Sequence, residues 1–203
     1  MNVVIIDYGM GNIKSLASAL SYVGANNIVI SSEYQKLKSA DKLILPGVGS
    51  FAKAINIIRQ KKIDIYLNEQ VLEKKKPILG ICLGMQLMGI SSTENGVNKG
   101  LGIIDGEVTK FNNNYIKVPH VGFNQVKVNP ELKLYQMMVG SLDFYFTHSF
   151  RMLSTNNINQ CHCYYGDEFI ASFENENIAG VQFHPELSQK NGLQLLKNFI
   201  EKF

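Results

Sequence analysis

The chain has 203 residues, of which 45% are hydrophobic, and this length predicts one compact domain over residues 1–203 with a large core. The net charge of +3 comes without a long Lys/Arg stripe, which argues against nucleic acid as a partner, and no apolar segment is long enough to span a membrane. Three cysteines do not build a disulfide framework, so we expect a reducing, cytoplasmic environment.

The first half of the chain alternates buried strands with amphipathic helices. Apolar runs predict strands at residues 3–6, 28–30 and 42–45 and just before Cys82, and the first of them lacks the basic start of a signal peptide. Helices are predicted from Asn12 as cap to about residue 23, from residue 51 onward, and in a segment that ends at the solvated basic run 74–76. This alternation predicts an α/β fold, an open and mostly parallel sheet with helices on both faces.

Three segments follow directly after predicted strands: residues 7–9, residues 46–49 and the region around Cys82. In parallel sheets, binding sites lie beyond the carboxyl ends of the strands, so we expect these segments to share one rim. The glycines at residues 9 and 11 lack the third glycine of a dinucleotide-binding fingerprint, and no cofactor is expected.

The segment Gly80-Ile81-Cys82-Leu83-Gly84 follows an apolar run and reads as a strand that turns sharply into a helix, here predicted from Leu83 to Ile90. Glycines flank the cysteine because such a tight bend leaves no room for Cβ atoms. A cysteine at the N-terminus of a helix lies at the positive end of the helix dipole, which favours the thiolate. The pattern therefore predicts that Cys82 is a nucleophile.

The second half is richer in strand patterns, which predict extra antiparallel strands beside the parallel core. They cover residues 101–111, 116–128, 144–148, 158–164 and 178–184, with a turn at residues 112–114. Ser188 is predicted to cap a last amphipathic helix. In Cys161-His162-Cys163, strand alternation places both cysteines on one face and the histidine on the other, so no metal site is expected.

The predicted base for Cys82 is His184, in the segment Val181-Gln182-Phe183-His184-Pro185-Glu186. His184 and Glu186 are two residues apart, so in an extended chain their side chains would project to the same side. A carboxylate beside an imidazole fixes its tautomer, while the imidazole activates a thiol. Cys82, His184 and Glu186 are thus predicted as nucleophile, base and orienting carboxylate; the alternative is that His184 simply ends a strand and Glu186 caps the last helix.

The two motifs at residues 80–86 and 181–186 together resemble those of the class I, or triad, glutamine amidotransferases. Further segments resemble one branch of that family, the glutaminase subunits of imidazole glycerol phosphate synthase. They are residues 6–12, 45–51, 100–104, 118–124, 144–149 and 191–193.

The resemblance implies a reaction and a set of site residues. The Cys82 thiolate would attack the side-chain amide of glutamine to form a thioester, and His184 would protonate the departing ammonia and then activate water. Backbone N–H groups of Leu83 and of Val48 or Gly49 would stabilise the oxyanion. The residues implied to hold or border the glutamine are Gln86, Glu94, His148, Ser149 and Phe150.

The resemblance also implies a heterodimer with a (β/α)₈-barrel synthase, which would use the ammonia to make imidazole glycerol phosphate and an aminoimidazole carboxamide ribotide. The implied docking residues are Asn12, Pro119, Val121 and Phe123, although Val121 and Phe123 fit a core equally well. Leu187 and Phe123 stand where this branch usually carries lysine and tryptophan, and residues 150–152 also depart from its pattern. A paralogue that feeds ammonia to an amidation step on a surface-polysaccharide sugar therefore remains the alternative.

Two other classes of protein are disfavoured. The interface and pocket segments argue against a cysteine hydrolase that acts without a partner, and the intact Cys82, His184 and Glu186 argue against a non-catalytic relic.

Overall fold

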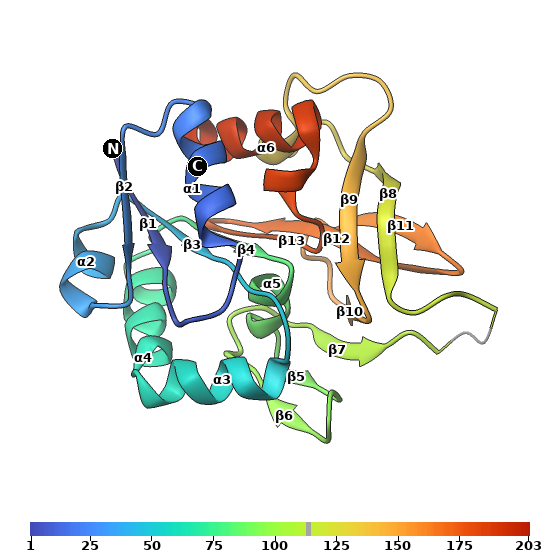
Figure 1. The fold of residues 1–203 in the computed structure, drawn as a ribbon, viewed down its shortest axis with the longest axis horizontal. Coiled ribbons are helices and arrows are strands. Elements are labelled where there is room, and N and C mark those ends of the chain that lie inside the picture. The colour runs from blue at the N-terminus through green and yellow to red at the C-terminus, as the bar shows by residue number, and fades with distance from the viewer. Residues whose placement is uncertain (113–114) are drawn as a thin grey trace.

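A computed structural model describes residues 1–112 and 115–203, and it is built on a nine-stranded sheet in the order β2-β1-β3-β4-β13-β12-β11-β8-β9 (Figure 1). The first five strands of this order are parallel, and the last four continue the sheet antiparallel. The strands are β1 (Asn2–Ile6), β2 (Asn27–Ser31), β3 (Lys42–Leu45), β4 (Ile78–Ile81), β8 (His120–Lys127), β9 (Asp143–His148), β11 (Cys161–Tyr165), β12 (Asp167–Asn175) and β13 (Ile178–Val181). The predicted α/β fold with extra antiparallel strands in the second half is confirmed, and the sheet as a whole is mixed rather than mostly parallel.

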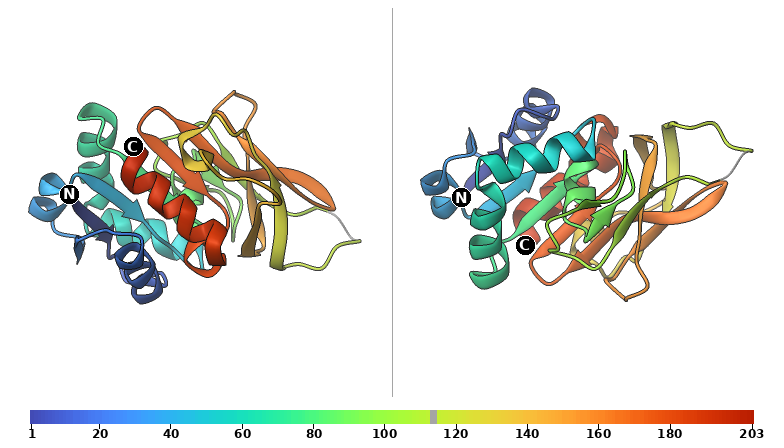
Figure 2. Two further views of the ribbon diagram at one scale, coloured as in Figure 1. Left: turned by 90° about the horizontal axis from the view of Figure 1, so that it is seen from above. Right: turned by 90° about the horizontal axis from the view of Figure 1, so that it is seen from below.

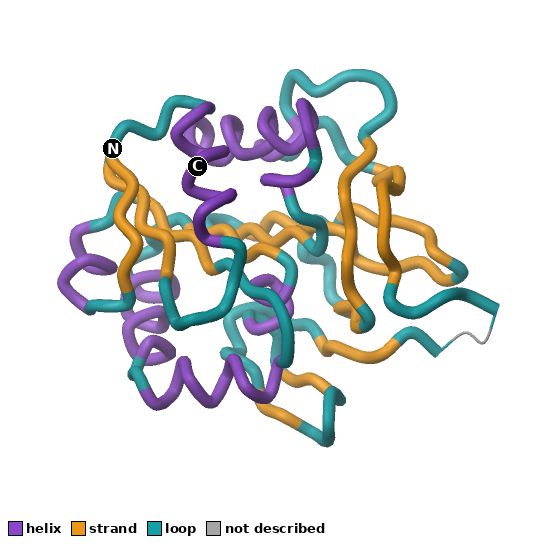
Figure 3. Tube along the Cα trace, viewed as in Figure 1, coloured by secondary structure: helices purple, strands orange, loops and turns teal. Residues whose placement is uncertain are grey.

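Helices cover both faces of the parallel strands, as Figure 3 shows. One group is α1 (Ile13–Tyr22) and α6 (Gln189–Lys202). The other is α2 (Tyr34–Ser39), α3 (Phe51–Gln60), α4 (Ile63–Leu67), which continues as the π-helical turn η1 (Asn68–Glu73), and α5 (Leu83–Leu87). Short 3₁₀ helices lie at η2 (Lys133–Tyr135) and η3 (Pro185–Leu187).

The alternation of β1 explains this layering. Val3 and Ile5 belong to the core beneath α1 and α6, whereas Val4 and Ile6 belong to the core beneath α2, α3 and α4. All four side chains are fully buried, because both faces of the strand are covered. The continuous apolar run in the sequence therefore reflects burial on two sides.

The antiparallel strands extend beyond the helical layers to one side of the molecule (Figure 2). A second, smaller sheet lies beside them in the order β10-β7-β5-β6. Its strands are β5 (Ser91–Ser92), β6 (Asn98–Lys99), β7 (Glu107–Lys110) and β10 (Phe150–Leu153).

The three predicted rim segments do meet at the carboxyl ends of β1, β3 and β4, which are neighbours in the sheet. The Tyr8 hydroxyl, just after β1, donates a hydrogen bond of 2.8 Å to the carbonyl of Pro46, just after β3. Tyr8 is also close enough to Cys82 for the two to interact electrostatically. The prediction of one shared rim is confirmed.

Two predicted elements are longer than those in the structure, for one common reason. They are the strand at residues 101–111 and the helix from Leu83 to Ile90. The helix stops at Leu87, and its last carbonyls accept hydrogen bonds from the segment that follows: Leu101 N–H donates to Leu87, and Ile103 and Ile104 N–H both donate to Met88. These backbone groups are therefore unavailable to a sheet. Only Glu107–Lys110 forms a strand.

Other predictions differ from the structure in detail. The strand expected at residues 116–128 begins at His120, and the one at 178–184 ends at Val181.

Ser188 precedes α6 but does not cap it with its side chain; its hydroxyl donates to the His184 carbonyl at 2.6 Å and accepts from Tyr145 N–H at 2.9 Å. Asn12 likewise precedes α1 without a side-chain cap bond. Of the turn predicted at residues 112–114, residues 113 and 114 lie outside the described residues.

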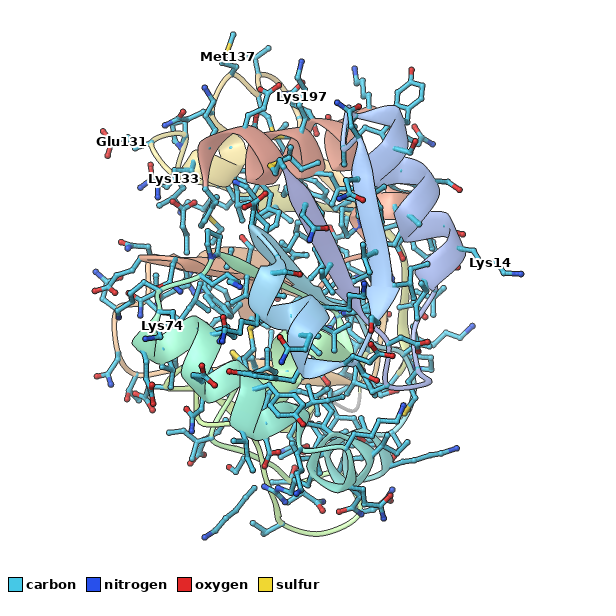
Figure 4. The ribbon with its side chains drawn as sticks, turned by 90° about the vertical axis from the view of Figure 1, so that its left-hand side faces the viewer. Lys14, Lys74, Glu131, Lys133, Met137 and Lys197 are labelled. Atoms are coloured by element: carbon cyan, nitrogen blue, oxygen red, sulfur yellow. The ribbon has the colours of Figure 1, made fainter. Side chains whose placement is uncertain are left out.

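Lys14, Lys74 and Lys197 project from different elements (Figure 4). The run at residues 74–76 is not entirely solvated, because the Lys76 ammonium donates to the carbonyls of Leu37 and Lys38 at 2.7 Å each. A search of the described residues for a helix with the length and apolarity to cross a bilayer finds none.

Candidate active site

Cys82 occupies a strained turn between β4 and α5. Its backbone angles are φ 52° and ψ −111°, a combination that residues with a side chain rarely adopt. Its side chain is almost fully buried, and Leu83 begins the helix directly after it. The first N–H groups of a helix have no partner within the helix, so the Leu83 N–H is free of helical bonding at this turn. The predicted strand–turn–helix is confirmed.

The two flanking glycines are required by close backbone contacts. A Cβ atom on Gly84 would lie 1.8 Å from the Leu45 carbonyl oxygen, at the end of β3. A Cβ atom on Gly80 would lie 2.8 Å from backbone atoms of Met85. Contacts this short are repulsive, so the turn can form only with glycine at both positions.

His184 and Glu186 are paired, but not through extended backbone. Residues 185–187 form the 3₁₀ turn η3, and this turn brings the two side chains together, so the predicted extended geometry is wrong while the contact itself is present. His184 Nδ1 donates to Glu186 Oε1 at 2.9 Å, and both side chains are 3% exposed. The other imidazole nitrogen, Nε2, is buried without a hydrogen-bond partner among the described residues.

The electrostatic surroundings of His184 favour its charged form. Burial lowers the pKa of His184, but the neighbouring Cys82 thiolate and Glu186 carboxylate outweigh burial and raise that pKa from 6.5 to about 10. An imidazolium next to a thiolate is the charge pair from which a cysteine nucleophile can attack and a histidine can then donate a proton.

This shift predicts how stability depends on pH. A histidine whose pKa is raised by folding stabilises the folded state fully below its unfolded pKa of 6.5, and this stabilisation is lost as pH rises through about 10. Glu186→Gln removes one group that raises the pKa. We therefore expect the stability gap between the wild-type chain and this variant to be widest near pH 6 and to shrink toward pH 10 in urea unfolding.

Glu201→Gln is the matched control, because Glu201 is half exposed and its ion pair is with Lys197 of the same helix, 3.9 Å away. A stability gap for Glu186→Gln that stayed constant or widened from pH 6 to pH 10 would contradict the assignment of the raised pKa to this pair.

Cys82 opens into a cavity of about 320 Å³. All five residues implied to hold or border glutamine line it, together with the three implied oxyanion residues. The lining comprises Val48, Gly49, Cys82, Leu83, Gln86, Glu94, Pro119, Thr147, His148, Ser149 and Phe150. Gly49 has φ +98°, in the left-handed region that glycine adopts readily. Thr147 was missed from the sequence, although its position at the end of an aromatic strand beside His148 marks it in hindsight.

Several of these side chains already make bonds that restrict what they can offer a ligand. Gln86 Nε2 donates to the carbonyl of Phe150 and to Gln182 Oε1, each at 2.9 Å, so its oxygen is the atom left for a ligand. Glu94 Oε2 accepts from the N–H of Phe51 at 2.8 Å and thereby holds the start of α3.

Two buried neutral histidines form a hydrogen-bonded pair, of which His148 lines the cavity. His148 Nδ1 lies 2.8 Å from the Phe150 carbonyl, which can only accept, so Nδ1 carries the proton. His148 Nε2 then accepts from His120 Nδ1 at 3.1 Å. Burial lowers the pKa of His120 to about 4 and that of His148 to about 3. His120 begins β8 and stacks on Tyr165 and Phe146.

The four implied docking residues are exposed or half-buried. Val121 and Phe123 are therefore surface residues and do not belong to the core. Val121 is 56% exposed and Phe123 50% exposed, on the outer face of β8. Pro119 is exposed and also lines the cavity. Asn12 is half-buried at the start of α1. An apolar surface next to a cavity opening is a common feature of protein interfaces.

Comparisons with known proteins identify the family to which the chain belongs. The family model described as glutamine amidotransferase class-I matches residues 4–203. The chain is 44% identical over 202 residues to imidazole glycerol phosphate synthase subunit HisH 2 of Vibrio vulnificus (strain YJ016), covering 99% of this chain and 94% of the relative. It is 45% identical over 199 residues to subunit HisH 1 of Campylobacter jejuni (strain RM1221), covering 98% of each.

Solved structures share the fold. A crystal structure of a glutamine amidotransferase superposes with a TM-score of 0.76 at 18% identity over 98% of each chain. The structure of PurLQS from Thermotoga maritima gives a TM-score of 0.74 at 18% identity, over 98% of this chain and 97% of the other. The chain is therefore a member of the class I glutamine amidotransferase family, alongside the HisH subunits of imidazole glycerol phosphate synthase.

Proposed function

We propose that this chain hydrolyses glutamine to glutamate and ammonia, and that it passes the ammonia to a separate barrel synthase making imidazole glycerol phosphate and an aminoimidazole carboxamide ribotide in histidine biosynthesis. The observation that carries the proposal is the buried His184–Glu186 pair facing Cys82 on a strained turn that opens into a cavity. The names of the HisH relatives support the histidine pathway over the surface-sugar alternative. We place the reaction in the cytoplasm, consistent with three buried free thiols.

The reaction would begin with attack of Cys82 Sγ on the side-chain amide carbon of glutamine. The tetrahedral intermediate carries its negative charge on oxygen, and the Leu83 N–H at the start of α5 is the fixed donor for it. Val48 and Gly49 border the same cavity and would supply the second N–H. The His184 imidazolium would then give its Nε2 proton to the departing nitrogen, and the C–N bond breaks to release ammonia.

The second half of the reaction returns the enzyme to its starting state. His184, now neutral, would take a proton from water as the water oxygen attacks the thioester carbon. The C–S bond breaks, glutamate leaves, and the sulfur departs as a thiolate beside the re-formed imidazolium. Glu186 keeps Nδ1 protonated throughout, so Nε2 is always the nitrogen that exchanges the proton.

The side chains that line the cavity would hold the two ends of glutamine. The carboxylate of Glu94 and the oxygen of Gln86 are acceptors suited to the α-ammonium group. Ser149 and Phe150 would contribute through backbone or hydroxyl groups, although the Phe150 carbonyl already accepts bonds from Gln86 and His148.

The proposal is tested by measuring glutamate release from glutamine by this chain mixed with the histidine-pathway barrel subunit of the same organism, with and without its ribotide ligand. We expect release that the ligand stimulates and that Cys82→Ala abolishes. If the two proteins do not bind and glutamate release is not stimulated, the histidine-pathway assignment is wrong and the surface-sugar alternative takes its place.

The proposed docking face predicts a separable effect. Phe123→Glu places a charge on the exposed apolar part of β8, and we expect it to weaken binding to the barrel subunit by about 10- to 100-fold, because buried aromatic anchors dominate interface energies. Titration calorimetry measures the affinity. Alkylation of Cys82 in the isolated chain should be unchanged, since Phe123 is half exposed and lies outside the cavity lining.

Tyr22→Glu is the matched control for this prediction. Tyr22 is 80% exposed but lies at the end of α1, away from the rim where α1 begins. Equal weakening by both variants would show that β8 is not the docking face.

A further inference from the structure

We propose that Gln182 is a catalytic hydrogen-bond donor to the Cys82 sulfur, which stabilises the thiolate before attack and when the thioester is hydrolysed. This inference rests on the proposed glutaminase function and adds a fourth side chain to its nucleophile, base and orienting carboxylate. Gln182 lies between the end of β13 and His184, and it was not singled out from the sequence as a site residue.

The contact is direct. Gln182 Nε2 lies 3.7 Å from Cys82 Sγ, within the distance expected of an N–H donor to sulfur. Cys82 Sγ also lies 4.0 Å from the carbonyl of Thr147, to which the sulfur can donate while it carries a proton. When the sulfur loses its proton, it can no longer form a hydrogen bond with the Thr147 carbonyl, because both atoms are then acceptors. The Gln182 N–H, in contrast, then donates to a full negative charge. Hydrogen bonds to charged groups are the stronger kind.

The orientation of the Gln182 amide is fixed by its neighbours. Gln182 Oε1 accepts from Gln86 Nε2 at 2.9 Å, and the same Gln86 nitrogen donates to the Phe150 carbonyl at 2.9 Å. Because the Phe150 carbonyl can only accept, Gln86 must present its nitrogen there and therefore also to Gln182. Gln182 must in turn present oxygen to Gln86 and nitrogen to the sulfur.

The side-chain amide of Gln182 cannot form hydrogen bonds with bulk solvent. The residue is 0% exposed, and its backbone N–H donates to the Ala171 carbonyl at 2.8 Å. A fully buried amide must form its hydrogen bonds inside the protein, so the bond to sulfur is one of the few that its nitrogen can make. The same segment of chain thus supplies Gln182 and, two residues later, His184 to the surroundings of Cys82.

The sulfur changes charge twice in the reaction. Attack on the amide carbon converts the thiolate into a neutral thioester sulfur, and hydrolysis breaks the C–S bond and returns the electron pair to sulfur. A donor held at a fixed place stabilises the sulfur in each charged state without any rearrangement. Gln182 therefore favours the reactive thiolate at neutral pH and helps the sulfur leave in the second step.

The test is the pH dependence of Cys82 alkylation by iodoacetamide in the full-length chain, which reports thiolate without requiring glutamine. Gln182→Met keeps an unbranched side chain of similar size but removes the donor. We expect alkylation near pH 7 to slow by about 10-fold and the midpoint of the pH profile to move up by about one unit. Gln70→Met is the matched control, because Gln70 is also a buried glutamine, 3% exposed in η1, and lies outside the cavity lining.

Gln182→Glu is the second variant. It keeps an oxygen that can accept the hydrogen bond from Gln86, so it can be measured instead if Gln182→Met does not fold. Above neutral pH its carboxylate has no proton to donate and repels the thiolate, so we expect an equal or larger slowing. A wild-type pH profile in a folded Gln182 variant would overturn the inference even if the wild-type chain releases glutamate. A wild-type chain that alkylates normally but never releases glutamate would instead overturn the proposed function.

Discussion

Cys82→Ala is expected to lower glutamate release by about 10⁴-fold or more, because it removes the atom that forms the thioester while the remaining groups only polarise and position the substrate. His184 cannot substitute for the sulfur, since its Nδ1 is committed to Glu186. The measurement is glutamate formed per chain, with glutamine in excess and the barrel subunit present.

The fold of this variant should be unaffected. Alanine at position 82 has the same unfavourable φ of 52° as cysteine, so no new backbone strain is introduced. Cys163→Ala is the matched control, because it removes a second buried thiol from β11, outside the cavity lining. Retention of glutamate release by Cys82→Ala would exclude thioester chemistry at this residue.

Gly84→Ala is expected to destabilise the chain by about 2–4 kcal/mol and to remove its activity as well. The added Cβ would lie 1.8 Å from the Leu45 carbonyl oxygen, and that atom belongs to the buried end of β3. Either α5 moves away from β3, which displaces Cys82 and the Leu83 N–H, or the turn fails to form. Urea unfolding gives the stability, and the Cys82 alkylation rate reports the turn.

Gly96→Ala serves as the comparison. Gly96 has φ +102° with no atom within 4 Å of an added Cβ, so it carries backbone strain but no clash. We expect Gly96→Ala to lower the free energy of unfolding by about 1 kcal/mol, from backbone strain alone. A Gly84→Ala variant no less stable than Gly96→Ala would show that α5 is free to move relative to β3.

The parallel half of the fold could be predicted because its signals are local. Each buried strand is a short apolar run, each helix has a regular apolar face, and the flanking glycines of Cys82 mark a tight turn without knowledge of what surrounds them. Because binding sites in parallel sheets lie beyond the carboxyl ends of the strands, residues 7–9, 46–49 and 82 could be predicted to lie close together. Only pattern and chain direction were needed for this part.

The antiparallel half was predicted less well because its signals depend on partners distant in sequence. Strand β12 was missed even though Phe169, Ala171 and Phe173 alternate, because the polar residues Ser172 and Glu174 on its other face are also buried. Ser172 hydrogen-bonds Tyr135, and the Glu174 carboxylate accepts two N–H groups at η2. These contacts make polar residues acceptable in a core, and no local pattern reveals them.

The site shows the same division. Motifs alone predict Cys82, His184 and Glu186 as site residues, but the extended geometry expected for the His184–Glu186 contact is wrong, since a 3₁₀ turn brings the two side chains together. Gln182 and the His120–His148 pair were missed as parts of one buried polar cluster. Their hydrogen bonds join β8, β9, β10, α5 and the segment after β13, which only the folded chain brings together.

Strand β8 places neighbouring residues under different selective pressures. His120 faces inward and hydrogen-bonds His148 behind the cavity, whereas Val121 and Phe123 face outward. Mutational tolerance along this strand should therefore depend on how variants are selected. Positions 121 and 123 would accept many residues when the chain is screened alone and few when growth depends on a partner, while position 120 would be restricted under both regimes.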